Sequence, residues 1–108
     1  MLKTLTRLGF TKTEAQVYVS LAKHGSQRAK EIAEALNTSK RQIDRSLKNL
    51  QAKGSVNADT KHPAKFTAVS LEKVLDALMK ANVEEAKRME QNKNELLDKW
   101  QTLIREPS

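Results

Sequence analysis

The stretch NTSKRQIDRSLKNL, residues 37–50, decides the fold because it joins a short turn to an amphipathic helix. Its first two residues predict a turn that is too short for a linker, so the helix after it must pack closely on the element before it. Ile43, Leu47 and Leu50 follow at i, i+4 and i+7, the spacing of an apolar stripe that faces a core. These features predict a helix over 39–53.

The side of this helix opposite the apolar stripe is cationic. At 100° per residue, Arg41 and Arg45 lie about 160° from the direction of Ile43, and Lys48 lies about 140° from it. One interpretation is a solvated basic face that binds no ligand. The other is a protruding surface that the major groove of DNA accepts.

The polar residues of this region divide into two sets by their chemistry. Arginine bonds guanine bidentately and glutamine bonds adenine in the same way, so the candidate base-reading residues are Arg41, Gln42 and Arg45. Cations and a helix amino terminus favour phosphate instead. The candidate phosphate contacts are Ser39, Lys40 and Lys48 on the helix, and Lys61, His62 and Lys65 around a later turn.

The segments on either side complete a recognisable architecture. Thr11 and Glu14 fit a capping box at the start of an earlier helix, and alternating apolar residues after Gly54 predict a β-hairpin. A helix-turn-helix followed directly by a hairpin is the arrangement of a winged-helix domain. The predicted order is helices over about 1–8, 11–24, 28–36 and 39–53, a hairpin over 55–69, and helix from 70 onward.

The last third of the chain predicts a single long helix. Ser70 is a candidate N-cap, and neither glycine nor proline follows until Pro107, so a rod roughly 50 Å long can form. The predicted fold class is therefore mainly α with a small β-hairpin: a winged helix-turn-helix DNA-binding domain over 1–70, then a long C-terminal dimerisation helix over 71–108.

Apolar residues recur in this last helix at heptad spacing. A helix of this length cannot bury such a stripe along its whole extent on one small domain, so a second copy of the chain is the expected partner. The alternative is that the stripe folds back on the helix at 1–8, and both arrangements can coexist in a dimer. The candidate dimerisation residues are Met79, Asn82, Ala86, Met89, Leu96, Trp100 and Leu103.

The positive charge of the chain is confined to its first two-thirds. Residues 1–70 hold 13 Lys and Arg against 5 Asp and Glu, whereas residues 71–108 hold 7 against 8. A clustered positive field favours a polyanionic partner. A charge that serves only solubility is the alternative.

Several classes of function find no support in the composition. The absence of cysteine excludes a disulfide framework and a thiolate metal site. The two histidines, His24 and His62, fall at a helix end and a wing tip, and neither a glycine-rich phosphate loop nor a paired-carboxylate pocket is visible, so neither an enzyme nor a metal or other cofactor is expected. No apolar run resembles a signal peptide or a membrane span, which predicts a cytoplasmic protein with no membrane partner.

Four stretches together resemble the TrmB-like archaeal transcriptional regulators: LGFTKTEAQVYVSL, AKEIAEALN, LKNLQAKGSV and HPAKFTAVSLEKVL. The resemblance covers residues 1–80 and implies a dimeric winged-helix DNA-binding regulator from an archaeon. Asp44 and Ser55 stand where the family more often has an aromatic and an aliphatic residue. Larger members carry a carboxy-terminal sugar-binding domain, for which the residues after 80 are too few, so no small-molecule effector is inferred.

The expected function is that of a sequence-specific regulator of transcription that binds double-stranded DNA as a homodimer. Helix 39–53 would enter the major groove, and the wing over 55–69 would contact the backbone or the minor groove. Two-fold symmetry predicts an operator that is an inverted repeat. The alternatives are a sequence-independent chromatin protein and a winged-helix module that binds other proteins of the transcription machinery.

Overall fold

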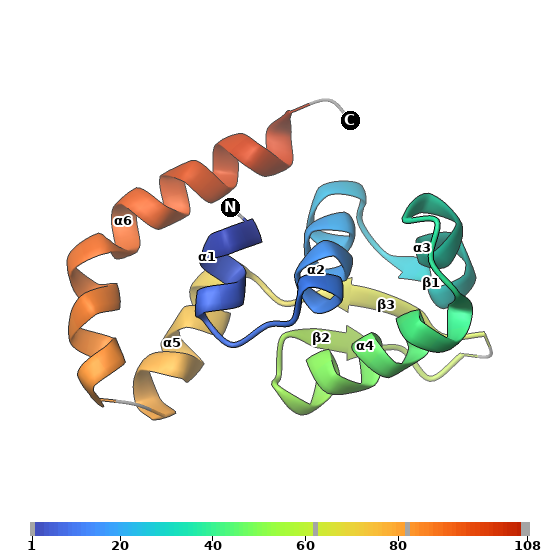
Figure 1. Ribbon diagram of the computed structural model, residues 1–108, viewed down its shortest axis with the longest axis horizontal. Coiled ribbons are helices and arrows are strands. Elements are labelled where there is room, and N and C mark those ends of the chain that lie inside the picture. The colour runs from blue at the N-terminus through green and yellow to red at the C-terminus, as the bar shows by residue number, and fades with distance from the viewer. Residues whose placement is uncertain (1, 62, 82, 107–108) are drawn as a thin grey trace.

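The computed structural model describes the backbone of residues 2–61, 63–81 and 83–106, and the side chains of these ranges outside 78–92. Helices pack around a small antiparallel sheet (Figure 1). In chain order the elements are α1 (Leu2–Arg7), α2 (Lys12–His24), β1 (Gln27–Arg28), α3 (Ala29–Ala35), α4 (Lys40–Ala52), β2 (Val56–Ala58), β3 (Lys65–Ala68), α5 (Leu71–Ala81) and α6 (Val83–Arg105). The predicted mainly helical fold with a small hairpin is confirmed.

The start of α2 is fixed by the capping box that the sequence predicts. The Thr11 hydroxyl accepts a hydrogen bond from the Glu14 amide at 3.1 Å, and the Glu14 carboxylate accepts one from the Thr11 amide at 3.3 Å. Two N–H groups that the first helical turn leaves without backbone partners are thereby satisfied. Gly9 has a φ of 101°, which lets the chain reverse between α1 and α2 at little steric cost.

The predicted turn between α3 and α4 is confirmed. Asn37 has a φ of 50°, a left-handed conformation that asparagine tolerates better than most residues. The Thr38 amide donates to the Ala33 carbonyl at 3.0 Å, which closes the end of α3. The Ser39 hydroxyl then accepts from the Gln42 amide at 3.2 Å, so that α4 begins one residue after the turn.

The sheet contains one more strand than the sequence predicts. The β2–β3 hairpin pairs Val56 with Ala68 and Ala58 with Phe66, as expected for the wing. β1 adds to the other side of β3, where Gln27 pairs with Phe66. A strand of two residues is too short to show an alternating pattern, so the residue pattern does not predict it.

Aromatic side chains join the helices to the end of the wing. Tyr18 is fully buried, and its ring centroid lies 5.8 Å from that of Phe10 and 5.4 Å from that of Trp100. Burial raises the pKa of the Tyr18 hydroxyl, which keeps it protonated. That hydroxyl donates to the Val69 carbonyl at 2.6 Å, so α2 is tied to the strand that leaves the wing.

The C-terminal segment differs from the predicted single rod. α5 ends at Ala81, α6 begins at Val83, and α6 runs back past α1 and α2 (Figure 1). The Lys93 ammonium lies 2.9 Å from the Asp76 carboxylate, which joins the two helices. The longest dimension of the molecule is 40 Å, shorter than the rod. Folding back buries Trp100, which an extended rod would expose to water.

Candidate nucleic-acid interface

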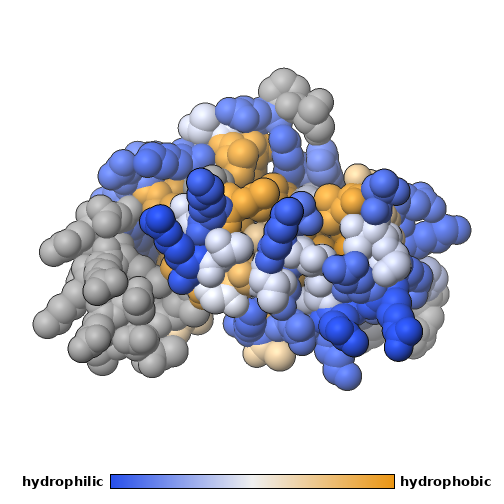
Figure 2. All heavy atoms as spheres, viewed as in Figure 1, coloured by the Kyte–Doolittle hydropathy of each residue, from blue (hydrophilic) through white to orange (hydrophobic). Residues whose placement is uncertain are grey.

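The two sides of α4 separate as the sequence predicts. Ile43, Leu47 and Leu50 are at most 1% exposed and belong to the core. The opposite side carries Arg41 and Arg45, which are exposed, as is Lys48 one turn later. The hydrophobic core therefore holds this helix so that its cationic side faces solvent. Hydrophilic side chains predominate in the lower right of Figure 2, the region where α4 and the wing lie.

The three cations on this side differ from Lys40 in their surroundings. Lys40 donates to the Asp44 carboxylate at 3.0 Å, one helical turn away, which offsets part of its charge. Within the part of the chain that is described, Arg41, Arg45 and Lys48 have no hydrogen-bond or ion-pair partner. Their full donor capacity is available to an anion, and an arginine has five N–H donors in a planar fork.

Gln42 makes a contact that the sequence does not reveal. Its side-chain amide donates to the Thr13 hydroxyl of α2 at 3.3 Å, instead of turning back to the Ser39 amide as a reciprocal capping box requires. The amide nitrogen has a second N–H, and its carbonyl oxygen can accept. Gln42 therefore keeps one donor and one acceptor for a base edge, in an orientation that α2 restrains.

The described part of the wing brings two further cations toward solvent. The Asp59 carboxylate accepts hydrogen bonds from the Lys61 amide at 3.2 Å and the Lys65 amide at 3.0 Å. Hydrogen bonding from the Lys65 amide lowers the pKa of Asp59, although desolvation opposes it, and the Lys61 amide and both lysine charges add to the lowering. Asp59 thus closes the turn, while the side chains of Lys61 and Lys65 are exposed. His62, the third predicted wing contact, lies outside the described residues.

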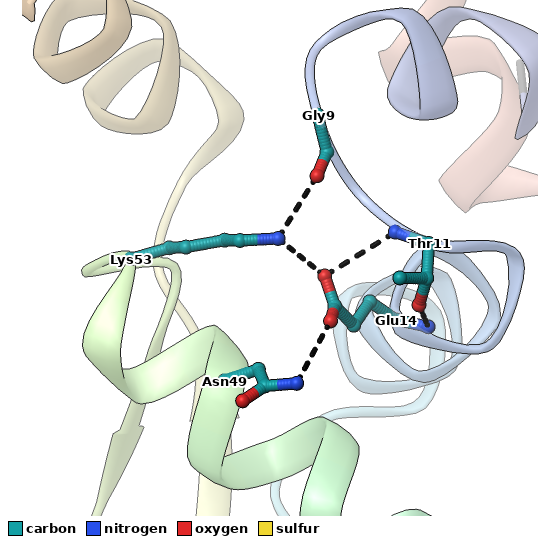
Figure 3. Close-up of polar contacts among 5 residues, drawn as sticks. All are labelled: Gly9, Thr11, Glu14, Asn49 and Lys53. Carbon is teal, nitrogen blue, oxygen red and sulfur yellow. Dashed lines mark hydrogen bonds and ion pairs between the residues drawn. The ribbon is translucent and has the colours of Figure 1, made fainter.

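A buried carboxylate holds the other end of α4. Glu14 is 2% exposed, and the Asn49 amide group donates to its second oxygen at 3.2 Å (Figure 3). The Lys53 ammonium donates both to Glu14 and to the Gly9 carbonyl, the latter at 2.9 Å. The same ammonium lies 5.3 Å from the centre of the Phe10 ring. α4 is therefore fixed to α2 and to the turn that joins α1 to α2.

The balance of forces on Glu14 keeps it ionised. Burial raises its pKa, but hydrogen bonds from Lys53, the Thr11 amide and Asn49, together with the charge of Lys53, outweigh burial and lower the pKa overall. From its sequence position, Glu14 is recognisable only as a capping residue. Nothing in the local pattern indicates Lys53 as its partner, because the two residues lie 39 positions apart.

The predicted dimerisation residues fall into two groups. The side chains of Met79, Asn82, Ala86 and Met89 lie outside the described residues. Trp100 is buried, and Leu96 and Leu103 pack partly buried on the same core. Those three therefore contact the domain of their own chain. The C-terminal helix folds back, but Trp100 lies against Tyr18 of α2, whereas the folded-back alternative expected the helix at 1–8 as the partner. The participation of Leu96, Trp100 and Leu103 in a seam with a second copy stays a prediction.

These features define the class of protein. A helix-turn-helix formed by α3 and α4, followed by a β-hairpin wing, with a cationic outer side on the second helix, is a winged helix-turn-helix of the DNA-binding type. The chain belongs to the TrmB family, because the family described as "Sugar-specific transcriptional regulator TrmB" matches residues 5–72. This family consists of transcriptional regulators, not of enzymes. No curated protein sequence matches the chain.

Solved structures with the same fold are found in several organisms. A possible transcriptional regulator from Methanosarcina mazei is 17% identical, with 85% of this chain and 83% of that chain covered and a TM-score of 0.61. Overoxidised AbfR of Staphylococcus epidermidis bound to DNA is 21% identical, with 89% and 77% covered and a TM-score of 0.57. The Zα domain of Carassius auratus PKZ with Z-DNA is 24% identical, with 54% and 94% covered and a TM-score of 0.53. At these identities, the likeness concerns the fold alone.

The two departures from the family pattern have clear surroundings. Asp44 is exposed and pairs with Lys40. Ser55 is 1% exposed, and its hydroxyl has no hydrogen-bond partner among the described residues.

The described ranges contain neither a metal-binding cluster nor a membrane-spanning helix. No cluster of three or more His, Cys, Asp or Glu side chains is placed to hold a metal ion there. Likewise, none of the helices in those ranges has both the length and the apolar character needed to cross a membrane. The predicted cytoplasmic location and archaeal origin stay predictions.

Proposed function

We propose that this protein is a sequence-specific, double-stranded DNA-binding regulator of transcription. α4 would enter the major groove, with Arg41, Gln42 and Arg45 reading bases. Ser39, Lys40 and Lys48 would contact phosphates. The wing would lie on the backbone or in the minor groove through its lysines and His62.

The observation that carries this proposal is the unpaired cationic side of α4. Arg41, Arg45 and Lys48 are exposed and have no partner within the described ranges, whereas the core fixes the helix that holds them. A basic face that is only solvated does not require side-chain contacts that fix its helix at both ends. Here Gln42 is tied to Thr13 at one end and Lys53 to Glu14 at the other, which supports recognition of bases, since base readout requires precise placement.

We also propose that the protein acts as a homodimer with the domain division 1–70 and 71–108. Support comes from the heptad spacing of apolar residues in the sequence from Met79 to Leu103, which includes more positions than the Leu96, Trp100 and Leu103 side chains that pack on the domain. Sedimentation should give a particle of about twice 12.2 kDa at micromolar concentration, and a 12.2 kDa particle would reject the dimer.

Selection of bound fragments from random duplex DNA tests the main proposal. A regulator should enrich an inverted repeat and prefer it over random duplex by about a thousandfold or more. A sequence-independent chromatin protein would enrich no motif while still binding duplex DNA. A protein-interaction module would bind neither selected nor random duplex DNA. Binding without a motif, or no binding at all, would overturn sequence-specific recognition.

A further inference from the structure

An open groove of about 580 Å³ lies away from α4 and the wing. Its walls come from α1, α2, the end of α3 and α6, so it connects the helix-turn-helix with the C-terminal helix. The volume falls within the range of about 300 to 1,000 Å³ found for sites that bind small molecules. The groove is thus large enough for a ligand and is formed by four separate elements.

The floor of the groove is apolar and incompletely covered. It is formed by Leu2, Val19, Ala35, Leu36 and Leu103. Leu2 is 41% exposed, the one large hydrophobic side chain of the described residues that counts as exposed. Figure 2 shows hydrophobic atoms at the surface where α1, α2 and α6 approach one another. Covering such a surface with an apolar group releases water and is favourable.

The lysines that line the groove, Lys3 and Lys23, have no acidic neighbour in its lining: among the described residues, no aspartate or glutamate lines it. Gln16 and Ser20 add polar groups capable of hydrogen bonding. A lining that combines apolar side chains with lysines is complementary to a molecule that has an apolar body and an anionic end.

We propose that this groove binds an amphipathic organic anion, such as an alkyl or aryl carboxylate. The apolar body lies on the floor, and the carboxylate lies among Lys3, Lys23 and Gln16. A second copy of the chain fits less well, because two such surfaces in contact would bring lysines together without a carboxylate from either lining. The proposal does not depend on DNA binding, and its test contains no DNA.

Octanoate is a suitable probe, titrated into the full chain below its micelle-forming concentration and followed by amide chemical shifts and calorimetry. We expect saturable binding with the largest shifts at groove residues, and weaker binding of octylamine, which has the same chain and the opposite charge. Lys23→Gln should reduce octanoate affinity about two- to fivefold, since one exposed ion pair is lost. Ala35→Trp should fill the groove and abolish binding, whereas Gln101→Trp, on an exposed face of α6 outside the groove, should not.

Four results would overturn the proposal. Octylamine could bind as tightly as octanoate, or the shifts could spread over surfaces outside the groove, or Ala35→Trp could bind as well as its control. Concentration-dependent shifts of the groove residues without probe would identify a second copy as the occupant and reject the anion site. Before titration, the melting temperatures of Lys23→Gln, Ala35→Trp and Gln101→Trp are to be measured, to establish that each variant is folded.

Discussion

The Lys53 ammonium and the Glu14 carboxylate form an ion pair across 39 positions of sequence, with the carboxylate 2% exposed. Because the lysine follows α4 and the glutamate lies in the first turn of α2, this pair sets where the proposed recognition helix ends relative to the core (Figure 3). The orientation of the proposed DNA-binding surface thus depends on a contact that is not part of that surface.

Removal of this carboxylate should destabilise the fold. Glu14→Ala deletes the helix cap and leaves the Lys53 and Asn49 donors without their acceptor, so we expect a loss of about 2 to 3 kcal/mol in the free energy of unfolding. Urea denaturation measures this loss. Glu31→Ala is the matched control, since Glu31 accepts from the Arg28 amide at an exposed helix start and should cost about 1 kcal/mol or less. Equal losses in the two variants would refute the role of the buried pair.

The same carboxylate makes stability depend on pH in a defined direction. Its pKa in the folded protein is below the ordinary value of 4.5, so its contribution is fully present above pH 4.5 and is lost as pH falls through the lowered pKa. Urea midpoints of the wild type should therefore fall more steeply below pH 4.5 than those of Glu14→Gln. Parallel curves for the two proteins would contradict the lowered pKa.

Arg41 should govern the choice of base at one position of the operator. Arg41→Ala should cost roughly 1 to 3 kcal/mol of operator binding and relax the preference at that base pair, because the bidentate contact is lost. Binding assays with single-base variants of the selected operator measure both effects. Lys73→Ala, which removes an exposed cation from α5, is the control and should leave the preference intact. An unchanged operator affinity for Arg41→Ala would show that another face reads the bases.

Lys61 should act on all duplexes alike. Its side chain is exposed on the wing, and its proposed partner is a phosphate, which is the same in every sequence. Lys61→Ala should weaken selected and random DNA by equal factors and reduce the slope of log affinity against log salt by about one. A loss confined to the selected operator would place Lys61 against a base instead.

A substitution of Trp100 distinguishes packing within one chain from packing between two copies. Trp100→Ala should cost about 3 to 5 kcal/mol of stability, because it leaves a cavity beside Tyr18. The cost should not change with protein concentration, since the contact lies within one chain. Thermal unfolding at several concentrations measures this, with Gln101→Ala as the exposed neighbour. A penalty that grows on dilution would place the indole between two copies.

Local patterns were sufficient to predict α4 and its two sides. The burial of Ile43, Leu47 and Leu50 is predicted by their helical spacing alone. The outward directions of Arg41 and Arg45 follow from the same helical spacing. The winged-helix order follows in the same way from caps, turns and alternation. The candidate DNA-binding face is therefore largely a product of local sequence.

Contacts between distant residues were not predictable in this way. The heptad pattern around Trp100 shows that a partner is needed, but the pattern is the same whether that partner is Tyr18 of the same chain or another copy. Similarly, Gln42 has the spacing of a capping residue, yet its amide bonds Thr13, 29 positions away. Tertiary packing decides these partners.

The position of the single tryptophan also gives the molecule a natural optical label. Its indole lies against Tyr18 at the contact between α6 and the domain, so its fluorescence wavelength responds when α6 moves away and water reaches the ring. Detachment of the C-terminal helix can thus be followed in the unmodified protein, without an added dye.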